Sequence, residues 1–253
     1  MIKFFRKIRQ KLLTENKFSK YLLYAIGEIM LVIIGILIAL SINNWNELRK
    51  SNIEEIAILK NLEDNLVLAS QLSESQLGDE ERLKKVLIYV LEIEPDNYQS
   101  NIDFISDKVF EEAIWDLEFS IPIINAYTDL KNTNKLSLIK DQTIKERFTS
   151  LEVSLNQLES MLNDRLNVHQ IRIDDVVEND INFIPLLKSS IPVINIEREK
   201  KNNYDEILKQ QRIRNLLGIK LALTQDVISY RKRLDKEIKE LRTLISSELS
   251  KRS

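Results

Sequence analysis

The longest apolar stretch of the chain occupies residues 21–42, which read YLLYAIGEIMLVIIGILIALSI. As an α-helix this stretch measures about 33 Å, enough to cross a hydrocarbon layer of roughly 30 Å. Glu28 is its one charged residue, and the cost of inserting it, about 3 kcal/mol, is smaller than the combined gain from thirteen Leu, Ile and Val side chains. The pattern predicts one transmembrane helix over residues 21–42, between a head of residues 1–20 and a body of residues 43–253.

Hydrophobic side chains recur at intervals of three and four residues through most of residues 43–253. The clearest stretches begin near Ile53, run from about 141 to 177, and run from about 203 to 248. This spacing places the apolar side chains on one face of a helix, which indicates helices that pack against one another. No alternating strand pattern with hairpin turns is evident. We therefore predict an all-α fold, with an N-terminal single transmembrane helix followed by an elongated antiparallel helical bundle.

Local signals suggest where several of these helices begin. Asp141 suits the N-cap of the long helix over 141–177, and Pro122 suits the first turn of a shorter helix. Residues 51–54, Ser-Asn-Ile-Glu, resemble a capping box, which predicts a helix start there. The alternative is that the membrane helix continues unbroken through this segment. Residues 180–201 contain two prolines among polar residues and are predicted to form a loop.

Charge is distributed unevenly, and its distribution predicts the orientation of the span. Residues 1–20 carry seven basic side chains and one acidic side chain, whereas residues 43–253 have a net charge of −7. Lys and Arg are retained on the cytoplasmic side of membranes, so the N-terminus is expected inside and the body outside. A cleavable signal peptide is the alternative, because Ala39-Leu40-Ser41 resembles a cleavage site. No polar spacer separates that site from the apolar stretch, which favours the anchor.

The residues next to the span are expected to contact the lipid bilayer. The head has apolar side chains on one helical face and basic ones mostly on the other, so it is predicted to lie along the inner leaflet. Lipid explains a basic run this close to the bilayer better than nucleic acid does, and no nucleic-acid binding is expected. The expected membrane-surface cations are Lys3, Arg6, Lys7, Arg9 and Lys11, and the expected interfacial aromatic residues are Tyr21, Tyr24 and Trp45.

Small residues line one face of the predicted span. Gly27, Gly35 and Ala39 recur at multiples of four positions, a spacing that lets a second helix approach closely. Glu28 lies beside this face and is predicted to make a polar contact with that helix, which belongs to a protein partner or to a second copy of the chain. The alternative is that Glu28 carries protons in a proton-coupled complex. Single-span subunits of such complexes share this layout of basic head, membrane acid and outer domain.

Composition argues against most catalytic and metal-binding chemistry. The absence of Cys excludes disulfides, thiolate nucleophiles and zinc–thiolate sites, and with four glycines no phosphate-binding loop is evident. His169 is the one histidine, which excludes sites built on histidine pairs, and we expect it at a surface or capping position. Asp174, Asp175, Glu178 and Asp180 are expected to form a solvated acidic helix end rather than a calcium site. No catalytic residue, metal site or cofactor is predicted, and we expect the protein not to be an enzyme.

Two segments of the chain resemble a known family. Residues 16–47, which read NKFSKYLLYAIGEIMLVIIGILIALSINNWNE, are similar to the opening of a bacterial family of single-span proteins known as domain of unknown function 6090. Residues 126–141, which read AYTDLKNTNKLSLIKD, resemble a second segment of that family more loosely. The resemblance implies an inner-membrane protein of an envelope-bearing bacterium of the Bacteroidota type. It implies no activity and no catalytic residue.

These expectations leave two main functional hypotheses. The first is a non-enzymatic interaction or scaffold module, in which the span and the helical body bind another protein of the bacterial envelope. The second is a sensory domain, in which a ligand shifts the packing of the helices and a separate partner carries the signal onward.

Overall fold

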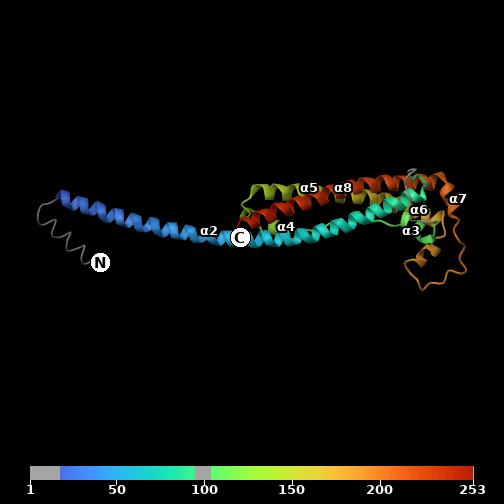
Figure 1. The fold of residues 1–253 in the computed structure, drawn as a ribbon, viewed down its shortest axis with the longest axis horizontal. Coiled ribbons are helices and arrows are strands. Elements are labelled where there is room, and N and C mark those ends of the chain that lie inside the picture. Colours follow the sequence, from blue (N-terminus) through green and yellow to red (C-terminus); the bar gives the residue numbers. More distant parts are fainter. Residues whose placement is uncertain (1–17, 95–103, 253) are drawn as a thin grey trace. The chain divides into compact units, whose positions relative to one another are not determined.

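The computed structural model describes residues 18–94 and 104–252, and every regular element in these residues is helical (Figure 1). The predicted all-α fold is therefore confirmed. The elements in chain order are α2 (Phe18–Val90), α3 (Asp107–Ile114), α4 (Asn125–Asn132), the 3₁₀-helix η1 (Lys135–Leu138), α5 (Gln142–Val168), the π-helix η2 (His169–Ile173), α6 (Asp174–Asn179), the 3₁₀-helix η3 (Ile184–Lys188), α7 (Tyr204–Lys209) and α8 (Gln211–Ser250).

The chain divides into two compact units, the first ending at Ala57 and the second beginning at Ile58. In the first unit, the apolar side chains of α2 between Leu22 and Ile42 are predominantly exposed. By length and composition α2 contains a stretch that could cross a membrane. The predicted membrane-surface cations Lys3, Arg6, Lys7, Arg9 and Lys11 lie outside the described residues, as do the side chains of Tyr21 and Tyr24.

Helix α2 runs for 73 residues without a break. Ser51 lies inside it, so the predicted helix start at residues 51–54 is wrong and the alternative of a continuous helix is correct. Gly78 also lies inside α2. Ser, Asn and Gly cost a helix at most about 1 kcal/mol each, and packing of the apolar face outweighs costs of that size.

The second unit is built on three long helices, α2 from Ile58 onward, α5 and α8. Helix α8 runs antiparallel to α2, because Ser246 near the end of α8 donates to Glu63 while Arg231 pairs with Gln76 further along α2. Helix α5 opposes α8 in the same way (Figure 1). Helices α2 and α5 consequently run in the same direction, and the chain between them has to return along the bundle.

The ends of α5 and α8 differ in part from the sequence-based prediction. Asp141 is the N-cap of α5 as predicted, and its Oδ1 accepts hydrogen bonds from the backbone N–H groups of Thr143 (2.7 Å) and Ile144 (3.2 Å). The predicted helix over 141–177 is divided, because α5 passes into π-helix η2 before α6 begins. The predicted final helix is also divided, at Gln210 between α7 and α8.

Two hydrophobic clusters form the core of the second unit. The first cluster joins α2, α4, α5 and the C-terminal half of α8, and includes Leu62, Leu130, Phe148, Leu158 and Ile238. The second cluster joins the end of α2, α3, α6, η3, α7 and the start of α8, and includes Leu87, Phe110, Val176, Leu186 and Leu217.

The segment that connects α3 to α4 links these two clusters. We call its residues 115–123 the strap. Trp115 lies in a turn at the end of α3, and residues 116–123 have no regular secondary structure. The prediction that Pro122 lies in the first turn of a helix is wrong, because α4 begins only at Asn125. Since α3 belongs to the second cluster and α4 to the first, the strap has to cross the region between them.

Candidate functional site

A set of buried polar side chains lies along the three long helices between the two hydrophobic clusters. We call this set the belt; its members are Gln76 and Glu80 on α2, Arg165 at the end of α5, His169 in η2, and Lys220, Thr224 and Arg231 on α8. Charged side chains are rarely buried this completely unless they are paired. The belt is therefore the most unusual chemical feature of the second unit.

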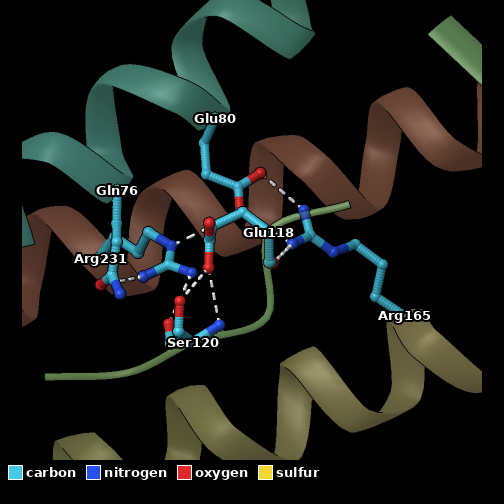
Figure 2. Close-up of polar contacts among 6 residues, drawn as sticks. All are labelled: Gln76, Glu80, Glu118, Ser120, Arg165 and Arg231. Atoms are coloured by element: carbon cyan, nitrogen blue, oxygen red, sulfur yellow. Dashed lines mark hydrogen bonds and ion pairs between the residues drawn. The ribbon is translucent and has the colours of Figure 1, made fainter. Parts of the chain in front are cut away.

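Glu80 is the acceptor that joins the three helices (Figure 2). Arg165 binds its carboxylate with both terminal nitrogens, Nη1 to Oε2 at 2.6 Å and Nη2 to Oε1 at 2.7 Å. Arg231 approaches the same carboxylate with Nε, 3.4 Å from Oε1, and donates from Nη1 to the amide oxygen of Gln76 at 2.7 Å. Two-point contacts of this kind are strong and directional. One carboxylate on α2 thus fixes the positions of arginines on α5 and α8.

The strap supplies further acceptors to the belt, and Figure 2 shows two strap residues beside the arginines. An extended segment has backbone carbonyls that no helix or sheet satisfies, so buried ones need other donors. Each of the three buried cations donates to one carbonyl at or next to the strap: Lys220 Nζ to Ile114 (2.9 Å), Arg165 Nη2 to Glu118, and Arg231 Nη2 to Ser120 (3.1 Å).

Burial also shifts the pKa values of Lys220 and its neighbour Asp116. Removal from water lowers the pKa of Lys220 to about 7, an effect that the nearby carboxylate of Asp116 partly opposes. Burial raises the pKa of Asp116, while the charge of Lys220 lowers it. Burial likewise lowers the pKa of Arg231, against the attraction of Glu80. The belt therefore contains one amine that titrates near neutral pH.

His169 is buried, so the expected surface position is wrong, but it is the C-cap residue of α5, so the alternative of a capping position is correct. Its side chain is only 8% exposed, and its Nδ1 has no hydrogen-bond partner among the described residues. Its ring packs edge-on against Trp115, with centroids 5.3 Å apart, and Phe183 lies at the same distance from Trp115. Burial, with a smaller effect from the charge of Lys220, lowers the pKa of His169 to about 4, so the imidazole is neutral at pH 7.

The comparisons with known proteins identify a family but no relative of established function. The model of a family of unknown function, DUF6090, matches residues 28–136. Over that range, less than half of the chain, the protein is similar to this family. No curated protein and no solved structure matches the chain. The DUF6090 range includes Gln76, Glu80 and the strap, whereas the cations that bind them lie beyond it, on α5 and α8.

The belt has the character of a structural network. Its arginines are engaged with Glu80, Gln76 and strap carbonyls. Among the residues that the structure describes, no group of three His, Cys, Asp or Glu side chains could hold a metal ion.

In the acidic segment predicted to be a solvated helix end, Asp175 and Asp180 both pair with Arg212, and the Asp180 contact measures 3.0 Å.

The predicted membrane-contact residues are described in part. A methyl group added at Gly27 or Gly35 would meet no atom within 4 Å. Ala39 is exposed, Glu28 is partly exposed, and Trp45 is 65% exposed. Close approach of a second helix to this face of α2 stays a prediction.

Sequence reasoning missed the belt, although a signal was present. The belt residues continue the three- and four-residue spacing of the apolar core positions on each helix. On α8 the series of buried positions reads Leu217, Lys220, Thr224, Val227, Arg231 and Leu234, and on α2 it reads Leu66, Ala69, Ser73, Gln76, Glu80, Leu83 and Leu87. Polar residues in phase with a core stripe indicate a buried polar layer. Counting only the apolar positions left this layer out.

Proposed function

We infer that this protein is a non-enzymatic, membrane-anchored interaction or scaffold module of the bacterial envelope. The observation that carries the proposal is that one helix, α2, contains both an exposed apolar stretch and a buried core face. Exposed apolar side chains in such a continuous stretch are stable in lipid and unfavourable in water. The core face of α2 belongs to a body with its own two hydrophobic clusters.

The proposed location is the inner membrane, with the N-terminus cytoplasmic and the body periplasmic. The support is the excess of Lys and Arg before the span. In this arrangement the second unit presents a helical surface in the periplasm. The span and the basic head hold the protein in the inner membrane.

The proposed contact with a partner runs through the small-residue face of the span. Gly27, Gly35 and Ala39 leave room for a second helix, and Glu28 supplies a polar group beside that room. In lipid, close van der Waals packing and interhelical hydrogen bonds drive such contacts, because apolar burial gives no net gain there. The partner is another single-span protein or a second copy of this chain.

Crosslinking in native membranes tests this proposal, and the absence of Cys makes the chain a clean background. Gly35→Cys lies on the small-residue face, and Ile33→Cys, on the opposite side of the helix, is the matched control. We expect a crosslinked product at Gly35→Cys and little at Ile33→Cys. An oxidant would give a disulfide-linked homodimer, and a bifunctional reagent would give an adduct with a different protein. Equal crosslinking at the two positions, or none at either, would contradict the proposal.

A further inference from the structure

The middle of the strap is held in place mainly by polar contacts. The backbone–backbone hydrogen bonds of the region end with Trp115, at the end of α3, and begin again at Tyr127 in α4. Between these points the strap carbonyls bind side chains of α5 and α8, as described above. Within the strap, the carboxylate of Glu118 accepts a hydrogen bond from the backbone N–H of Ser120 at 2.7 Å.

Two apolar side chains of the strap are turned outward. Phe119 is 63% exposed and Ile123 is 67% exposed, whereas Pro122 is buried at one end of the strap. The residues that flank the strap, Ile114 and Ile124, are buried in the two hydrophobic clusters. The strap therefore has two packed ends, with Trp115 against His169 and Ile121 against the first cluster, and a middle in which Phe119 is exposed. Segments with few buried apolar contacts open at lower free energy than the core that supports them.

Opening of the strap would also return water to the belt. With the strap in place, Arg165, Lys220 and Arg231 are each at most 3% exposed, and removing a charge from water carries a large desolvation cost. Hydration of these cations offsets part of the loss of their bonds to the strap carbonyls. Opening of the hydrophobic clusters exposes only apolar surface, and hydration does not offset that cost. Local opening at the belt therefore costs less free energy than opening of the clusters.

We propose that residues 115–123 act as a latch, which opens between its buried ends and uncovers the cationic belt while α2, α5 and α8 stay packed. The geometric basis is the set of three buried cations that reach carbonyls at or next to the strap. The latch is a conformational device of the second unit and goes beyond the proposed scaffold function. Its open state presents Arg165, Lys220 and Arg231 to solvent on one side of the bundle.

Thiol labelling of single-Cys variants of the full chain in lipid nanodiscs tests the latch. Thr224→Cys places a thiol in the belt, between the two α8 cations that reach the strap, and Val227→Cys places one in the first cluster a single turn away. Both side chains are fully buried. We expect labelling of Thr224→Cys to be at least about 10-fold faster than that of Val227→Cys and nearly independent of low urea concentrations, as local opening requires.

Loosening the latch gives a second readout. Lys220→Met removes the donor to the carbonyl of Ile114, and Lys232→Met, at an exposed position on the same helix, is the control. We expect Lys220→Met to speed labelling of Thr224→Cys several-fold without changing that of Val227→Cys, and Lys232→Met to change neither. Equal rates at positions 224 and 227 with the same urea dependence would show that only global unfolding exposes the belt, and would overturn the proposal. If Lys220→Met does not fold, the comparison of labelling rates between Thr224→Cys and Val227→Cys, each in the otherwise unchanged chain, decides the question by itself.

Discussion

The belt depends most on one residue, Glu80. Its carboxylate is fully buried and contacts two arginines that are themselves buried, so this one negative charge stabilises two positive charges. Replacing one partner of such a set leaves the others charged and without a counterion in a medium of low polarity. The energetic role of each belt residue follows from this coupling more than from any single hydrogen bond.

Glu80→Gln is expected to lower the free energy of unfolding by about 3–5 kcal/mol, because two buried guanidinium groups lose their counterion. Urea unfolding of the full chain in detergent, followed by circular dichroism, measures the change. Glu81→Gln is the matched control, since Glu81 lies beside Glu80 but is partly exposed and pairs with the exposed side chain of Lys232. Its effect should stay within about 1 kcal/mol. A loss for Glu80→Gln no larger than that of the control would show that the belt does not stabilise the fold.

His169 is expected to make stability depend on pH below about 6.5. Its pKa is lowered to about 4 in the folded protein by burial and by the neighbouring charges of Lys220 and Arg165, against the attraction of Asp174. The unfolded chain therefore binds a proton between pH 6.5 and 4 that the folded chain does not bind, and stability falls as pH falls. A loss of about 2 kcal/mol between pH 6.5 and 5 is expected. The free energy of unfolding of His169→Gln should lose this dependence on pH across the interval. The same decrease with pH in His169→Gln as in the unchanged chain would refute the assignment.

At the scale of elements, the sequence predicts some features well because they are local. The helices follow from the spacing of apolar residues, and the start of α5 follows from the side chain of Asp141. The course of the strap, the parallel direction of α2 and α5, and the π-helical turn at His169 depend on contacts between distant residues. The belt had a local signal, in that Lys220 and Arg231 occupy core positions of α8, but pairing them with Glu80 requires the fold.

The N-cap of α5 offers a direct test at this scale. Asp141→Ala removes the acceptor for two backbone N–H groups and should lower the free energy of unfolding by about 1 kcal/mol. Asp164→Ala, at an exposed position inside α5, is the control and should be neutral or slightly stabilising, because Ala is the better helix former. Both changes are measured by urea unfolding of the full chain. An equal effect of the two substitutions would mean that the cap does not contribute.

At the scale of the whole molecule, the protein combines an apolar stretch of α2, a helical body and a polar belt within that body. The family match covers part of each of the three. The central claim is that α2 anchors the chain in the inner membrane, with the body on the periplasmic side. The fold of the body does not depend on this claim, whereas the proposed function does.

Labelling of single cysteines in spheroplasts tests that claim most directly. Ser150→Cys places a thiol on the exposed surface of α5, and Thr14→Cys places one in the basic head. A membrane-impermeant maleimide should label Ser150→Cys in intact spheroplasts and Thr14→Cys only after the membrane is permeabilised, with both variants remaining in the membrane after carbonate extraction. The reverse labelling pattern, or release of the intact chain by carbonate, would contradict the account.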